Sequence, residues 1–92
     1  MMTEKAKDRF LEEYEDLFKR IIELDVYIAN WDDLEEDFEE RPSTPIELFH
    51  LQAQAMRQYQ GILEWRAKIE GITEIYDIQR KYITELAKTA VE

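Results

Sequence analysis

Helix-breaking residues are scarce in this chain, and this scarcity constrains the fold more than any other feature of the sequence. Only two glycines and two prolines occur in 92 residues, and the first of them is Pro42. Hydrophobic residues make up 45% of the chain and charged residues 37%, a mixture typical of folded helical proteins rather than disordered ones. We therefore predict an all-α fold in a single domain, since a chain this short supports one core.

The first thirty residues predict a long amphipathic helix over residues 4–30, with Thr3 as its N-cap. Its apolar residues alternate at spacings of four and three, which is a heptad seam: Phe10, Tyr14, Leu17, Ile21, Leu24 and Ile28. A second apolar row, Leu11, Phe18 and Ile22, makes the stripe wider than a two-stranded coiled coil needs. We expect this helix to contact neighbours on two sides.

A second helix is predicted over residues 45–70. Thr44, Pro45 and Glu47 fit a capping box with proline at the first helical position. Gly61 lies in the middle, where glycine costs about 1 kcal/mol relative to alanine, so we expect it to admit a close neighbour or a ligand. Two apolar rows follow helical spacing: Leu48, Leu51, Ala55, Tyr59, Ile62 and Ile69 in one, and Phe49, Met56 and Leu63 in the other.

Residues 31–44 are predicted to connect the two helices. They include the run DDLEEDFEE at residues 32–40, with seven acids and no base, which favours a solvated loop; Leu34 and Phe38 are spaced for one short amphipathic turn. After Gly71, a candidate C-cap or hinge, helical spacing resumes over residues 72–90, as a third helix or as a continuation. The predicted fold is a long antiparallel helical hairpin with a C-terminal helical extension.

Charge and composition exclude several classes of function. The formal net charge is -10, so we expect no binding to DNA, whose affinity comes from neutralising phosphates with Lys and Arg. Residues 1–44 hold 15 acids and 6 bases, whereas residues 45–92 hold 7 acids and 6 bases, so an anionic ligand should meet the second half. No apolar run approaches a membrane span, and the lack of cysteine fits a reducing cytoplasm.

The residues needed for catalysis or metal binding are missing. His50 is the lone histidine, Ser43 is the lone serine, and glycine-rich phosphate loops are absent. The numerous carboxylates lie at positions typical of solvated helix faces. We therefore predict a non-catalytic protein with no metal and no cofactor.

Arg66 interrupts the apolar pattern of the second helix. It lies three residues after Leu63 and three before Ile69, so a permanent charge falls within an apolar row. One interpretation is an ion pair with an acid of the facing helix or of a second subunit. The other is a bidentate contact to a phosphate or a base edge, with Tyr59, Trp65 and Arg57 adding stacking and charge.

The second helix resembles a known family. Residues 51–66, read as Q-x-x-A-M-x-x-Y-x-x-I-L-x-x-R from Gln52 to Arg66, are similar to the hairpin domain shared by phage anti-CBASS and anti-Thoeris sponges. Asp8-Arg9 and the segment from Leu24 to Ile28 are similar to the first helix of that domain, so the resemblance covers about residues 8–70.

The resemblance implies a protein that sequesters cyclic nucleotide immune messengers without cleaving them, in the cytoplasm of the infected bacterial host. It leaves open cyclic dinucleotides, cyclic trinucleotides and cyclic ADP-ribose isomers as ligands. It also implies a homo-oligomer, typically a hexamer, with ligands between protomers. The alternative is a non-catalytic structural or protein-binding module acting through the acidic residues 32–40. The candidate ligand-binding residues are Arg66, Arg9, Tyr27, Tyr59, Arg57 and Trp65.

Overall fold

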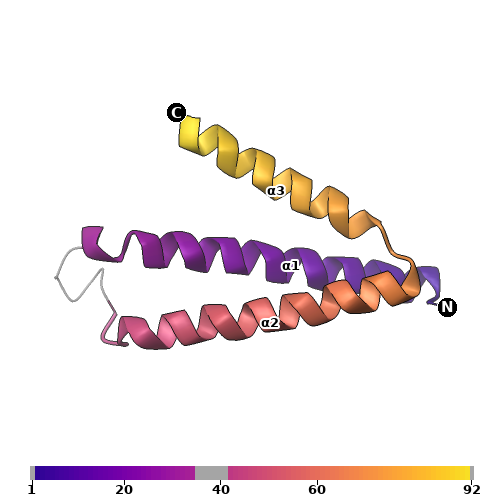
Figure 1. The fold of residues 1–92 in the computed structure, drawn as a ribbon, viewed down its shortest axis with the longest axis horizontal. Helices are drawn as coiled ribbons and strands as arrows, with labels where there is room; N and C mark the ends of the chain where they lie inside the picture. Colours follow the sequence, from indigo (N-terminus) through magenta and orange to yellow (C-terminus); the bar gives the residue numbers. More distant parts are fainter. Residues whose placement is uncertain (1, 35–41, 92) are drawn as a thin grey trace.

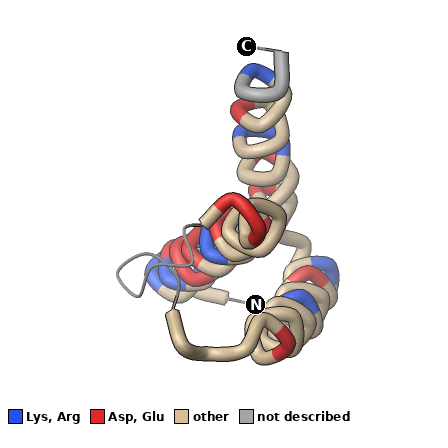
Figure 2. The backbone as a smooth tube through the Cα atoms, turned by 90° about the vertical axis from the view of Figure 1, so that its left-hand side faces the viewer, with Lys and Arg blue, Asp and Glu red and all other residues tan. Residues whose placement is uncertain are grey.

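The computed structural model describes residues 2–34 and 42–91, and within these ranges the protein is all-helical, as predicted. The elements are α1 (Glu4–Ala29), the short 3-10 helix η1 (Trp31–Asp33), α2 (Ile46–Glu70) and α3 (Glu74–Val91). In Figure 1, α2 runs back alongside α1, and α3 then turns back from the end of α2, runs above α1 and diverges from it toward the C-terminus. Figure 2 shows how far the C-terminal part of α3 projects from the α1–α2 pair. In the described ranges, no helix is both long enough and apolar enough to cross a membrane.

The two helix starts differ in how they are capped. The Thr3 hydroxyl accepts a hydrogen bond from the Ala6 amide at 3.1 Å, which confirms the predicted N-cap of α1. The capping box predicted for α2 is wrong, because the helix begins one residue later, at Ile46. Pro45 has an extended backbone (ψ 143°) and is itself the cap residue, without a side-chain cap bond. Thr44 is therefore one residue too early to serve as the cap.

Gly71 ends α2 and makes α3 a separate helix. Its φ is +71°, a left-handed conformation that favours glycine. The Ile72 amide donates to the Ala67 carbonyl at 2.8 Å and the Gly71 amide donates to the Lys68 carbonyl at 3.3 Å, the paired bonds of a Schellman motif. Ile72, directly after the turn, is buried and ties the motif to the core.

The core lies where α1 meets both other helices. The α1 seam is buried at Phe10, Tyr14, Leu17 and Ile21, so α1 has neighbours on two sides, as expected from its wide stripe. Of the two apolar rows on α2, the one containing Leu63 faces this core, together with Ala53 and Ala67. The other row is exposed, including Leu48, Leu51, Ile62 and Ile69.

A polar network joins the three helices inside this core. Tyr14 of α1, which is fully buried, donates from its hydroxyl to Glu64 Oε2 of α2 at 2.7 Å. Gln79 of α3 donates from Nε2 to the Tyr14 hydroxyl at 2.9 Å and to Glu64 Oε2 at 3.2 Å. Burial raises the pKa of Tyr14. The network satisfies the Tyr14 hydroxyl and sets the register of the three helices.

The side chains of α3 also form polar contacts with α1. Lys7 pairs with Glu74 near the start of α3, and Lys81 pairs with Glu15 at 3.1 Å further along. The Tyr82 hydroxyl donates to the same Glu15 carboxylate at 3.1 Å. These contacts attach the first half of α3 to the flank of α1.

Aromatic rings close the other end of the α1–α2 pair. The rings of Tyr27, Trp31 and Phe49 pack against one another with centroids 5.6 to 5.8 Å apart. The acidic connection begins beyond this cluster, and residues 35–41, including Phe38 of the predicted short turn, lie outside the described residues.

Candidate ligand-binding groove

A long groove follows one side of the α1–α2 pair. It consists of three adjoining hollows of about 230, 420 and 590 Å³. The first and second share Arg9 and Glu13, and the second and third share Leu17, Arg20 and Tyr59. Because neighbouring hollows have walls in common, we treat them as one feature, the α1–α2 groove. One wall is formed by residues of the N-terminal segment and α1 from Met2 to Tyr27, and the other by Gln52, Met56, Tyr59 and Arg66 of α2.

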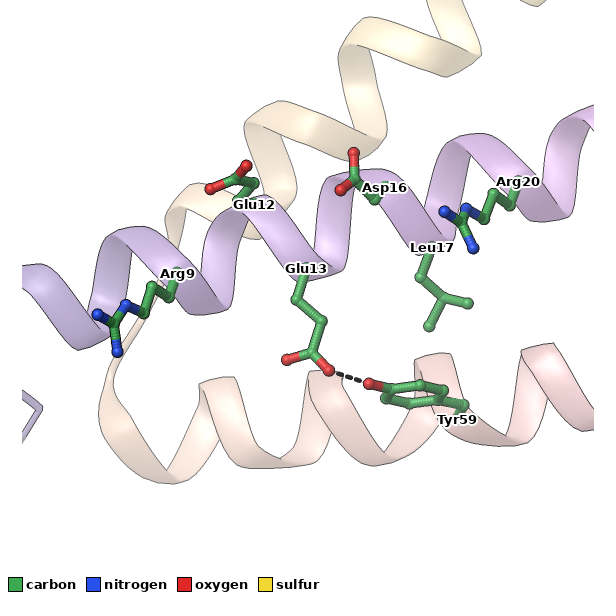
Figure 3. A pocket seen from close by; sticks show the side chains of 7 residues that line it. All are labelled: Arg9, Glu12, Glu13, Asp16, Leu17, Arg20 and Tyr59. Atoms are coloured by element: carbon green, nitrogen blue, oxygen red, sulfur yellow. Dashed lines mark hydrogen bonds between the residues drawn. The ribbon is translucent and has the colours of Figure 1, made fainter.

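The α1 wall follows from helical spacing. Arg9, Glu13, Asp16 and Arg20 are separated by four, three and four residues, so they lie along one flank of α1. Figure 3 shows Arg9 and Arg20 at the two ends of the middle hollow, with Tyr59 of α2 between them and hydrogen-bonded to Glu13. In the same view, Glu13 and Leu17 point toward α2.

Three arginines line the groove and form no ion pair within the described ranges. Lys7, Arg57, Arg80 and Lys81 each pair with a carboxylate in the structure. Arg9, Arg20 and Arg66 form no such pair with any residue that the structure describes, although Glu12, Glu13, Asp16 and Glu23 line the same groove. In Figure 3, Glu12 and Asp16 point away from α2. The groove therefore presents guanidinium groups that remain available to an anion.

Arg66 is exposed rather than buried in a seam. Its guanidinium carbon lies 5.2 Å from the centroid of the Phe10 ring, a cation–π contact that positions the group beside Arg9 at one end of the groove. The ion pair considered for Arg66 from the sequence does not form with the described residues of this chain. Because its apolar row faces outward, the charge remains hydrated.

The structure brings four of the six candidate ligand-binding residues together in the groove: Arg9, Tyr27, Tyr59 and Arg66. It places the other two elsewhere. Arg57 pairs with Asp25 across the two helices, and Trp65 lines a hollow between α2 and α3. Sequence reasoning missed Arg20 as a candidate, although it stands seven residues before Tyr27 and therefore on the same helix flank.

An apolar stripe on α2 borders the groove. Leu48, Leu51, Ile62 and Ile69 are between 54% and 74% exposed. Tyr59 precedes Ile62 by three residues and Arg66 follows it by four, so groove and stripe lie side by side on α2. Apart from its two chain neighbours and the backbone of its own helix, Gly61 has no described atom within 4 Å of where a Cβ would lie, so packing among the described residues does not require glycine there.

The groove has the chemistry of an anion-binding site. It combines guanidinium groups with two tyrosine rings, which suits an anionic ligand that carries flat rings. Across the described residues, no cluster of three or more His, Asp or Glu side chains is arranged to hold a metal ion.

The comparisons with known proteins identify one family. A family model described as Sequestin matches residues 4–69, which span α1, the connection and all but the last residue of α2. The match covers more than half of the 92 residues, and α3 lies beyond it. No curated protein and no solved structure matches the chain.

Proposed function

The chain belongs to the Sequestin family, the phage sponges of cyclic nucleotides, and from this premise we propose that it sequesters a cyclic nucleotide immune messenger in the α1–α2 groove. The family resemblance predicted from the sequence is confirmed by the match over residues 4–69. Members of this family bind their targets rather than transform them. We propose that this chain holds its ligand intact, in the cytoplasm of the infected bacterium.

The observation that carries this proposal is the set of groove arginines that pair with no carboxylate of the described residues. A cyclic oligonucleotide or a cyclic ADP-ribose isomer carries at least two phosphate charges beside flat bases. Arg9 and Arg20 at the ends of the middle hollow provide planar forks for phosphate oxygens, with Arg66 beyond Arg9. The exposed ring of Tyr59 provides a surface on which a base stacks, and the half-buried ring of Tyr27 adds an aromatic edge at the far end of the groove.

The net charge of -10 does not prevent anion binding at short range. At physiological ionic strength the Debye length is about 8 Å, so distant acids are largely screened from the groove. The nearest acids, Glu12 and Asp16, point away from α2 (Figure 3), and Glu13 is engaged by the Tyr59 hydroxyl. The groove lining holds three guanidinium groups and four carboxylates, Glu23 included, so anion binding depends on direct contacts of the guanidinium groups with phosphate oxygens, and it should weaken as salt increases.

We further propose that the groove is completed by a second copy of the chain. The α2 stripe of Leu48, Leu51, Ile62 and Ile69 is an exposed apolar surface of the kind that marks interaction sites. Because the stripe borders the groove, a copy packed on it covers the open side and encloses the ligand between protomers. A homo-oligomer, with the hexamer of related sponges as the expected form, would also supplement the modest core of a 92-residue chain.

Calorimetric titration of matched arginine variants tests the ligand site. The ligands are cyclic dinucleotides, cyclic trinucleotides and cyclic ADP-ribose isomers, each titrated into wild type, Arg66→Ala, Arg9→Ala and Arg57→Ala. Hydrogen bonds to charged groups contribute about 1.5–3 kcal/mol, so either groove variant should weaken binding of at least one ligand about 10- to 150-fold.

The control variant is Arg57→Ala, which removes the same charge from the same helix outside the groove, where Asp25 already pairs with it. It should bind like wild type, and size-exclusion chromatography should show that all variants keep the same assembly. Unchanged calorimetric binding in Arg66→Ala and Arg9→Ala, or equal losses in all three variants, would contradict the proposed site.

A further inference from the structure

A second hollow, separate from the groove, lies between the end of α2 and the start of α3. Its volume is about 330 Å³, and it is lined by Glu64, Trp65, Lys68, Ile75, Tyr76 and Gln79. We propose that this α2–α3 hollow binds a second ligand, a nucleoside monophosphate or a nucleotide unit of the same chemistry, by stacking its base on the exposed rings and attracting its phosphate with Lys68.

The two aromatic rings are the first argument. Trp65 is 70% exposed and Tyr76 is 53% exposed, although both line a concave surface. In the part of the chain that the structure describes, neither ring packs against another ring, whereas Tyr27, Trp31 and Phe49 pack together. Two flat apolar surfaces that flank a hollow without touching each other suit a flat ring placed against them, and nucleobases stack on such rings in a sequence-tolerant way.

The floor of the hollow is already ordered. Ile75 is buried, and the Glu64 carboxylate and the Gln79 amide belong to the network with Tyr14. Glu64 Oε2 accepts hydrogen bonds from Tyr14 and Gln79, so these two side chains partly stabilise its charge. Because this floor is fixed by packing inside the core, a ligand would not have to order it, which lowers the entropic cost of binding.

Lys68 provides the positive charge that would attract the phosphate of the ligand. It is exposed in the last turn of α2 and pairs with no carboxylate among the described residues. A single ammonium beside two stacking surfaces suits a ring compound with one phosphate better than a polyphosphate. The hollow is also at the small end of the range for ligand pockets, about 300–1,000 Å³.

The hollow and the groove are independent features. They share no lining residue, and Ile75, Tyr76 and Gln79 belong to α3, beyond the family match. Trp65 and Arg66 are neighbours in the sequence but line different surfaces. The inference therefore goes beyond the proposed sponge function, because it gives the α3 extension a binding role of its own.

Tryptophan fluorescence tests this site directly. The chain has two tryptophans, and Trp31→Phe leaves Trp65 as the only one while keeping an aromatic ring in the Tyr27–Phe49 cluster. In this background, AMP should quench Trp65 emission saturably, adenosine should do so at higher concentration, and ribose 5-phosphate should not. Tyr76→Ala should weaken AMP binding about 5- to 150-fold, the range for loss of one base–aromatic stack.

The role of the Lys68 charge and the independence of the hollow from the groove are tested in the same Trp31→Phe protein. Lys68→Ala should weaken AMP binding and reduce its salt dependence, and Lys68→Arg should restore both. Arg66→Ala should leave AMP binding unchanged, even where it abolishes cyclic nucleotide binding in the groove. Circular dichroism checks that each variant is folded. Equilibrium dialysis with radiolabelled AMP gives a second readout, in which Trp65→Ala should bind less AMP than wild type.

Distinct outcomes separate the two proposals. Absence of saturable quenching by AMP, or quenching unaffected by both Tyr76→Ala and Lys68→Ala, overturns the second site. Loss of AMP binding in Arg66→Ala also overturns it, because the ligand would then occupy the groove. Retained AMP binding in a protein that binds no cyclic nucleotide supports the second site and counts against the proposed function alone.

Discussion

Tyr14→Phe removes one hydroxyl from the network that joins α1, α2 and α3. The ring stays in the core, so its apolar packing is retained, but Glu64 loses a donor at 2.7 Å and Gln79 loses an acceptor at 2.9 Å. A hydrogen bond to a charged group contributes about 1.5–3 kcal/mol. Gln79 still donates to Glu64 at 3.2 Å, which favours the lower half of that range. We therefore expect a loss of about 2 kcal/mol, which corresponds to a decrease in Tm of about 8–16 °C for a domain of this size.

The control for this prediction is Tyr59→Phe. Tyr59 also donates to a glutamate, Glu13, but this pair is exposed at the groove, where such contacts contribute about 0–1 kcal/mol. Urea unfolding of both variants, followed by circular dichroism at one protein concentration, measures the difference. Equal losses in the two variants, or a change below about 0.5 kcal/mol in Tyr14→Phe, would refute the assignment of the network as a stabilising element of the core.

The same network predicts a dependence on alkaline pH. Burial raises the pKa of Tyr14 above its ordinary value of 10.0, with the hydrogen bond to Glu64 acting in the same direction. The folded state therefore retains the proton more strongly than the unfolded state. The resulting stabilisation is complete below pH 10 and is lost as the pH rises through the pKa of the folded state. Tyr14→Phe should lose less stability over this alkaline range than wild type.

Three further predictions concern the two glycines and the attachment of α3. Gly61→Ala should raise the free energy of unfolding by about 1 kcal/mol, because outside its own helix the added methyl group meets no described atom within 4 Å; a lower stability or a smaller assembly in chromatography would instead indicate a neighbouring protomer at Gly61. Gly71→Ala should lower the free energy of unfolding by about 1–2 kcal/mol, because its φ is +71°; thermal unfolding that matches wild type would contradict this. Hydrogen bonds from Lys81 and then Tyr82 lower the pKa of Glu15, so its stabilising contribution is complete above pH 4.5 and is lost as the pH falls through the lowered value. The protection factors of the α3 amides, which are corrected for the intrinsic pH dependence of exchange, should therefore fall in acid, and Glu15→Gln should lower them at neutral pH; unchanged protection factors in both experiments would exclude this contact as an attachment point.

Much of the helical architecture follows from the periodicity of apolar residues. The predictions that were wrong or incomplete failed for specific physical reasons. The α1 seam was predictable because one continuous stripe of apolar residues must be buried. On α2, two apolar rows compete for the core, and spacing alone does not indicate that the row with Leu63 faces inward while Ile62 remains exposed. The start of α2 was misplaced because Pro45 is compatible both with a cap position and with the first helical turn, and only its extended ψ distinguishes them.

The candidate site was predicted only in part, because the sequence does not show which faces of the helices meet. Trp65 and Arg66 were grouped because they are adjacent, but successive residues on a helix are rotated by about 100°, so they line different surfaces. The Arg57–Asp25 pair depends on the register of α2 against α1, which a single sequence does not contain. Predicting Arg20 as a site residue required knowing both that it lies on the groove flank of α1 and that Tyr59 of α2 lies opposite. The second fact is known only from the folded chain.

Recovery of an intact ligand from the protein tests the central claim most directly. The protein is incubated with a panel of cyclic dinucleotides, cyclic trinucleotides and cyclic ADP-ribose isomers, separated from free ligand by filtration, and then denatured. A sponge depletes at least one ligand from the filtrate in proportion to the protein added and releases the same molecule, chemically unchanged, on denaturation. A filtrate that retains every ligand at its initial concentration, or a ligand recovered as a cleaved product, would contradict the proposed function.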